Sequence, residues 1–269
     1  MSDILEKIAS TAATAAYAAN WQLPRKWNKE AAAAGVRHRV FCASMADVFD
    51  NQVWDRHRDD LWHLIHQTPH LDWLLLTKRP QNIVKMLPSP DIGAPAWGEG
   101  WKNVWLGTTV ENQEEADRRI PHLLAVPAVK RFLSCEPLLG KINLISWLPG
   151  VDWVICGGES GPHARPMHPD WARSLRNQCA SAGVPFFFKQ WGEWAPSYGA
   201  INCNRRAVSV YDGSGFDIST GVRARSIDLF DSCQMVRAGK KVSGALLDGV
   251  EHRAFPTWND QPATEGDAP

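Results

Sequence analysis

The sequence has no excess of charge of either sign, because its 29 Lys and Arg residues equal its 29 Asp and Glu residues among 269. No overall field therefore draws the protein to nucleic acid or to a membrane surface, and a nucleic-acid partner stays open only through a local basic surface. No stretch reaches the roughly 18 consecutive apolar residues of a membrane helix. We therefore expect a protein without a membrane partner, located in the cytoplasm.

Clustered cysteines are also missing. The six cysteines form no Cys-x-x-Cys pair and lie at no zinc-type spacing from a histidine. We expect free thiols in a reducing compartment and no metal site. Ser44, Ser134 and Ser160 lack the strand–turn–helix setting of a nucleophile elbow, which disfavours a serine hydrolase.

The sequence does contain regularly spaced apolar runs rich in β-branched and aromatic residues. They cover residues 36–44, 71–77, 103–109, 128–134, 151–157 and 184–190. Most are nearly continuous rather than alternating, as expected for parallel strands that are covered on both faces. Helical segments separate the runs, so the pattern predicts a parallel α/β architecture. The count alone leaves a closed or partial barrel and a doubly wound sheet as alternatives.

The regular alternation ends after Trp194. We predict a (βα) barrel domain with a short helical leader over residues 1–194. Residues 195–260 are expected to form an irregular extension with short β-strands around an Asp-Gly turn, packed on the barrel. Residues 261–269 are expected to be a flexible tail.

Each apolar run ends in a polar or charged cluster. The carboxyl ends of parallel strands lie at one edge of the sheet, where ligands bind in such folds. We therefore predict a site at this edge, with Glu136, Glu159 and Lys189 as candidate catalytic residues. The candidate cofactor-binding residues are Ser44, Lys78, Arg79, Thr109, Glu111, Asn112, Ser134, Gly157, Gly158, Arg165 and Gln190. Their mixed charges suit a small zwitterionic or polar ligand, because each ligand charge finds an opposite partner.

Several of these candidates also have a structural interpretation. Gly157 and Gly158 let backbone amides approach a ligand, but they equally fit a tight bend after a strand. Asn112 begins a capping-box pattern, and His168 precedes a proline where a helix N-cap is expected. Pro137 disfavours helical geometry at Glu136, so we expect its side chain at the strand edge. If a basic residue such as Lys78 or Lys189 is its neighbour, the two form a charged and rigid pair.

Six segments carry a resemblance to a known family: VFCASMADVFD, LLLTKRP, VWLGTTVEN, RFLSCEPLLG, WVICGGESG and VPFFFKQWGEW. Together they resemble an uncharacterised phage- and prophage-borne family assigned to the radical-SAM-like barrels. The resemblance runs from about Trp21 to Trp194 and returns at GKKVSGALLDG. It implies a TIM-like barrel or partial barrel and, as a cofactor, S-adenosylmethionine.

The sequence departs from this family at its start. Longer members carry a Trp-Asn-Pro segment and three clustered cysteines, whereas here no cysteine precedes Cys42. Radical chemistry requires three thiolates on a 4Fe–4S cluster, so an iron–sulfur cluster is not supported by this sequence. A partner chain is one source of the missing segment. The GGES turn follows the fifth strand rather than an early one, so Glu159 is a pocket candidate without an assigned cofactor contact.

Three functions remain as alternatives. The first is a radical-SAM-like barrel protein of unknown substrate, without cluster-dependent activity in this chain. The second is a non-catalytic barrel that binds a small ligand, nucleic acid or a partner protein. The third is a hydrolase in which Glu136 and Glu159 act as acid and base, a chemistry that needs two carboxylates about 5–9.5 Å apart.

Overall fold

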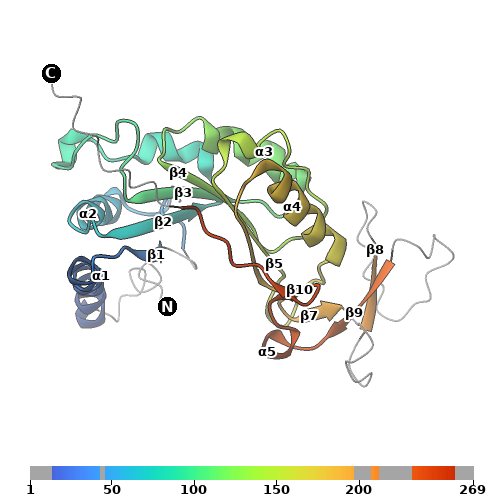
Figure 1. Ribbon diagram of the computed structural model, residues 1–269. Helices are drawn as coiled ribbons and strands as arrows, with labels where there is room; N and C mark the ends of the chain where they lie inside the picture. Colours follow the sequence, from blue (N-terminus) through green and yellow to red (C-terminus); the bar gives the residue numbers. More distant parts are fainter. Residues whose placement is uncertain (1–13, 43–45, 197–206, 212–231, 258–269) are drawn as a thin grey trace.

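The computed structural model describes residues 14–42, 46–196, 207–211 and 232–257. Its centre is a six-stranded parallel sheet that curls into a half-barrel (Figure 1). The strands are β1 (His38–Cys42), β2 (Leu71–Thr77), β3 (Val104–Thr109), β4 (Lys130–Cys135), β5 (Trp153–Gly157) and β6 (Phe186–Gln190). Neighbours in the sheet follow the order of the chain without reversal. The predicted parallel α/β fold is confirmed, as a half-barrel rather than a doubly wound sheet.

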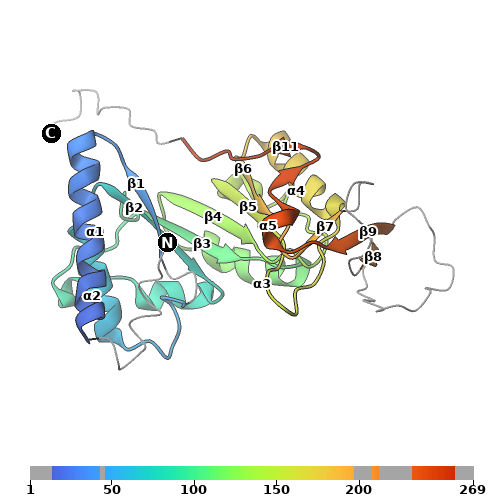
Figure 2. The same cartoon turned by 90° about the horizontal axis from the view of Figure 1, so that it is seen from below.

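Helices cover the outer face of the curled sheet. They are α1 (Thr14–Ala34), α2 (Asp55–His66), α3 (Gln113–Leu124) and α4 (Pro169–Ala182), with short 3-10 turns at Pro80–Met86, Pro90–Ile92 and Leu148–Gly150. In Figures 1 and 2, α1 and α2 lie beside β1 and β2, whereas α3 and α4 pack farther along the sheet. Leu75, Leu106 and Phe188 are fully buried beneath these helices.

Two helix starts are organised as the sequence predicts. The Asn112 side chain accepts a hydrogen bond from the Glu115 amide and caps α3. The His168 Nδ1 atom accepts from the Asp170 amide at 3.1 Å and caps α4. Both caps satisfy amides that a helix leaves without partners at its first turn.

The inner face of the sheet has an aromatic layer near the amino ends of the strands. Trp105, Phe132 and Trp153 are buried there, and Trp153 meets Phe187 edge to face at a centroid distance of 5.7 Å. A Cβ at Gly107 would overlap the Phe132 ring, so the absence of a side chain at this position admits the ring. Because this face is also apolar, the strands read as nearly continuous hydrophobic runs.

The segments after β6 pack around the last strand of the half-barrel. A small antiparallel sheet contains β7 (Trp194–Pro196), β9 (Ser232–Arg237) and β8 (Ala207–Tyr211), in that order. The short helix α5 (Lys240–Ser243) precedes a hairpin of β10 (Leu246–Leu247) and β11 (Val250–Glu251) around an Asp-Gly turn. These short strands lie in the range that we expected to form an extension, and the predicted tail, 261–269, lies outside the described residues.

The chain then returns along the free edge of β6. Phe187 and Arg253 form an antiparallel bridge, the Phe188 amide donates to the His252 carbonyl at 2.9 Å, and the Ala254 amide donates to the Phe186 carbonyl at 3.3 Å.

In the described ranges, no helix has the length and hydropathy required to span a bilayer.

Candidate functional site

Charged side chains follow five neighbouring strands at the carboxyl edge of the half-barrel. Lys78 comes directly after β2, Glu136 follows β4, and Lys189 lies in β6 just before its end, while Glu111 and Glu159 lie two residues beyond β3 and β5. All these strands are parallel, so their carboxyl ends lie at the same edge. We call this set, with Arg165, the charged edge.

The first pair of the charged edge joins the ends of β2 and β3. The Lys78 Nζ atom lies 2.9 Å from Glu111 Oε1, and Arg119 Nη1 from α3 lies 2.6 Å from Glu111 Oε2. Burial alone would raise the pKa of Glu111, but Lys78 and Arg119 together outweigh it and hold that pKa below its usual value. Glu111 is therefore a fixed anion with cations on both sides.

Sequence reasoning did not identify Arg119. Its Nη1 atom also donates to the Thr109 carbonyl at 2.7 Å, and its side chain is only 8% exposed. Arg119 shares the buried side of α3 with Ala116, Ile120 and Leu123. The signal in the sequence is an arginine among the apolar residues of a helix. Such an arginine indicates a buried carboxylate nearby, because arginine is seldom buried unless it is paired.

The second pair reaches from β4 across β5 to β6. Lys189 Nζ donates to Glu136 Oε2 at 3.1 Å, so Lys189 is the basic neighbour of Glu136, one of the two that the sequence suggested. Burial raises the pKa of Glu136, and Lys189 and Ser134 oppose this shift through hydrogen bonds and charge. Glu136 therefore retains a proton to higher pH than an ordinary glutamate.

Gly157 makes this crossing possible. It lies in β5 directly beneath the Glu136 side chain, and a Cβ at this position would overlap Glu136 Oε1 and approach its Cδ to 3.2 Å. The missing side chain at Gly157 therefore provides the space that the Glu136 carboxylate occupies on its way to Lys189.

The third pair lies in the loop after β5. Arg165 Nε and Nη2 each donate to one oxygen of Glu159 at 2.9 Å, and the Arg165 amide adds a third bond at 2.7 Å. These hydrogen bonds, the side-chain ones first, lower the pKa of Glu159. Glu159 in turn raises the pKa of Arg165 by accepting its side-chain hydrogen bonds, and the charge of Glu111 adds to that shift, as the charge of Lys78 adds to the lowering at Glu159. The first and third pairs therefore lie within electrostatic reach of each other.

The glycine turn also serves contacts within the chain. The Gly158 amide donates to the Gln190 carbonyl at 2.9 Å, and a Cβ at Gly158 would overlap the Trp191 carbonyl. Gln190 Nε2 donates to Ser160 Oγ at 3.1 Å and joins the same two loops. The Gly158 amide is thus already used, and the assignment of Gly157, Gly158 and Gln190 to a ligand stays a prediction.

Other predicted residues have partners beside the charged edge. Arg79 lies 3.1 Å from both Asp47 Oδ2 and Asp50 Oδ2, and it ties the loop after β1 to the end of β2. Asn112 uses its side chain to cap α3. Thr109 and Ser134 are buried at the ends of β3 and β4. Ser44 lies outside the described residues.

The described cysteines do not form an iron–sulfur site. Cys135, Cys156 and Cys179 are buried between the sheet and α4. Burial raises the pKa of each thiol, that of Cys179 to about 12, so these thiols stay protonated in the metal-free chain. In the part of the chain that the structure describes, no three His, Cys, Asp or Glu side chains are arranged to hold a metal ion.

Comparison with known proteins gives a family without an assigned reaction. No curated protein matches the chain. The model of a family described as proteins of unknown function, DUF5131, matches residues 3–256, and the chain therefore belongs to the DUF5131 family.

Proposed function

We propose that the charged edge binds a small zwitterionic ligand of the S-adenosylmethionine class, inside a half-barrel of the TIM-like, radical-SAM-like type. The observation that carries the proposal is the set of three carboxylate–cation pairs, Glu111–Lys78, Glu136–Lys189 and Glu159–Arg165. They come from different strands and lie at one edge. A ligand that carries both charges can exchange partners with such pairs without leaving a charge unpaired.

Each member of the pairs has a defined task in this proposal. Glu136 and Glu159 would bind the ammonium or sulfonium group of the ligand, and Lys189 and Arg165 would bind its carboxylate. Arg119 would not contact the ligand but fixes Glu111. Lys78, whose side chain is exposed, would turn from Glu111 toward a second anion of the ligand. Cys135, Cys156 and Cys179 are buried thiols that form no disulfide, which is typical of a reducing compartment and supports a cytoplasmic location. A phage origin rests on the sequence resemblance.

Cluster-dependent radical chemistry is not part of the proposal for this chain alone. Among the described residues, no three His, Cys, Asp or Glu side chains are arranged to hold a metal ion, so the described cysteines do not fit an iron–sulfur cluster. A partner chain that brings three cysteines stays a prediction, and co-purification with neighbouring gene products is its direct test.

A second candidate function is acid–base hydrolysis. Burial raises the pKa of Glu136, whereas Arg165 lowers that of Glu159. Two carboxyl groups whose pKa values are displaced in opposite directions are typical of an acid and a base that share one site. Glu136 would be the proton donor in this reaction and Glu159 the permanently charged partner.

Isothermal titration calorimetry with S-adenosylmethionine and S-adenosylhomocysteine tests the first proposal. We expect both to bind, and Glu136→Gln to weaken binding about tenfold, the typical effect of losing one hydrogen bond to a charged group. Lys26→Met is the matched control, because Lys26 pairs with Glu30 in an exposed position on α1. Absence of binding contradicts the proposal. Equal affinity of wild type and Glu136→Gln, with a changed melting temperature, makes Glu136 a structural residue only.

Hydrolysis of a panel of chromogenic glycosides tests the second candidate. It requires turnover that Glu136→Gln abolishes and that falls as pH rises through the pKa of Glu136, since the acid must be protonated. Turnover that survives this substitution contradicts it.

A further inference from the structure

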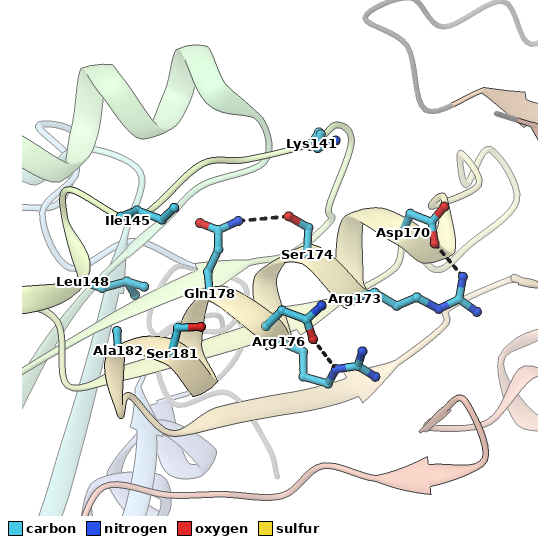
Figure 3. Close-up of a pocket in the computed structure, with 11 residues that line it drawn as sticks. Lys141, Ile145, Leu148, Asp170, Arg173, Ser174, Arg176, Gln178, Ser181 and Ala182 are labelled. Atoms are coloured by element: carbon cyan, nitrogen blue, oxygen red, sulfur yellow. Dashed lines mark hydrogen bonds and ion pairs between the residues drawn. The ribbon is translucent and has the colours of Figure 1, made fainter.

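The outer side of the half-barrel has a hollow whose arginines already have partners. It has a volume of about 620 Å³, and Figure 3 shows that α4 and the segment from Lys141 to Leu148 form its walls. Arg173 pairs with Asp170 and Asp248, and Arg176 pairs with Asp248. A cation without such a partner lies elsewhere, beside the charged edge.

This cation is Lys240 in the short helix α5. Its side chain is exposed, and within the described part of the chain it makes no hydrogen bond or ion pair. The neighbouring cation of the charged edge, Lys189, lies 3.1 Å from Glu136. Lys240 is therefore a positive charge that no described carboxylate neutralises by contact.

The loop after β6 holds α5 in place. The Trp191 amide donates to the Gly244 carbonyl at 3.0 Å, and the Gly239 amide donates to the Glu193 carbonyl at 3.0 Å. These bonds fix both ends of α5 on the loop that directly follows β6. Figure 2 shows α5 beside β7, the strand that begins after this loop.

The same loop contacts the turn that carries Glu159. The Glu193 amide donates to the Glu159 carbonyl at 2.9 Å. A Cβ at Gly192 would overlap this carbonyl, so the absence of a side chain at Gly192 allows the close approach. One loop therefore joins α5 to the charged edge and gives the backbone of Lys240 a fixed place beside it.

The charge of Lys240 acts on Glu136. Burial raises the pKa of Glu136, the charge and hydrogen bond of Lys189 oppose this shift, and the charge of Lys240 opposes it as well. Charges interact only weakly through water when they are far apart, so this effect places the Lys240 ammonium group near the Glu136–Lys189 pair.

We propose that Lys189 and Lys240 form an anion subsite at the charged edge, which binds the carboxylate of the ligand in competition with Glu136. An ammonium group has three donors, and Lys189 uses one of them on Glu136. Ammonium groups are compact charges without a planar preference, so the subsite also accepts other small oxyanions. The proposal rests on the proposed function for the ligand that brings the carboxylate, whereas a free anion tests the subsite by itself.

Sulfate is a suitable free anion, because it is compact and carries no group for the rest of the charged edge. In protein labelled with carbon-13 at the lysine ε positions, sulfate should shift the signals of Lys189 and Lys240 with one common midpoint. Sodium chloride at the same ionic strength should shift neither signal. Equal shifts of the Lys240 signal and of the signal of its exposed neighbour Lys241 would overturn the proposal.

Three variants give different expected signs. Lys240→Gln should weaken sulfate binding about tenfold, as expected for the loss of a charge-assisted contact. Lys241→Gln removes the neighbouring exposed lysine and should leave the affinity unchanged. Glu136→Gln should tighten sulfate binding about threefold or more, because Lys189 loses its anionic partner. Unchanged affinity in Lys240→Gln, or weaker binding in Glu136→Gln, overturns the proposal.

S-adenosylhomocysteine connects the subsite to the proposed ligand. Lys240→Gln should weaken its binding about tenfold and leave the binding of 5′-methylthioadenosine, which lacks the carboxylate, unchanged. Sulfate binding at Lys240 without binding of S-adenosylhomocysteine means that the proposed function fails and the anion subsite stands. Equal affinity of wild type and Lys240→Gln for S-adenosylhomocysteine leaves the proposed function intact and overturns the assignment of Lys240 to the carboxylate.

Discussion

Gly157→Ala is expected to destabilise the protein because Glu136 needs the space above Gly157. The added Cβ would overlap Glu136 Oε1 and lie 3.2 Å from its Cδ, closer than ordinary van der Waals contact. The Glu136 side chain is only 16% exposed and is bonded to Lys189, so it cannot move aside without losing that contact. Overpacking costs about 1–3 kcal/mol, and the smaller entropy of unfolded alanine returns about 0.4–1 kcal/mol. We expect a net loss of about 1–2 kcal/mol.

Urea denaturation followed by circular dichroism measures this loss in a double-mutant cycle. In a Glu136→Ala background the long side chain is absent, and Gly157→Ala should then cost less than about 0.5 kcal/mol, so the two substitutions are coupled. In a Glu136→Gln background the full cost should remain, because Gln has the same shape. Gly140→Ala is the control, since its Cβ would meet only Asn112 Cβ at 3.7 Å. An equal cost in all three backgrounds refutes the steric explanation.

Two further predictions concern the other pairs of the charged edge. Glu111→Gln should destabilise the protein by about 1–3 kcal/mol in denaturant titrations, because the buried Arg119 keeps only Glu115 of its two carboxylate partners. Lys26→Met, in an exposed pair, should change stability by less than about 0.5 kcal/mol, and equal effects of the two substitutions would contradict the assignment. The pKa of Glu159 is lowered from 4.5 by Arg165, so its stabilising contribution is present above that ordinary value and is lost as pH falls through the folded-state pKa. Arg165→Met should therefore flatten the acid limb of stability against pH, and an unchanged slope would contradict the assignment.

The location of the charged edge followed from the sequence, whereas its pairing did not. Parallel strands bring their carboxyl ends together, so residues after the apolar runs had to lie at one edge. For Glu136, the sequence offered both Lys78 and Lys189 as basic neighbours. The choice of Lys189 depends on Gly157, which lets a side chain from β4 cross β5. Whether the Glu136 side chain can cross β5 depends on the order and register of the strands in the sheet. Local sequence patterns contain neither.

Other features depend on contacts between distant parts of the chain. The apolar residues of α3 lie on its buried side, but their spacing does not show that Arg119 lies there too and meets Glu111. Gly158 was interpreted as an approach for a ligand or as a bend, and its nearest neighbour is the Trp191 backbone from the next loop. The strong helix caps at Asn112 and His168 were predictable, because a cap requires only residues within one turn.

The antiparallel return of the chain along β6 has a consequence for synthesis on the ribosome. Strands β1 to β6 pair in the order in which they are made, so the half-barrel can grow from its amino end by contacts between successive units. The segment His252–Ala254 can pair with the edge of β6 only after the whole extension has been translated. Until then β6 presents unpaired amides and carbonyls, the kind of surface that templates association between nascent chains. The last described residues thus complete the sheet and end the period in which it is prone to aggregate.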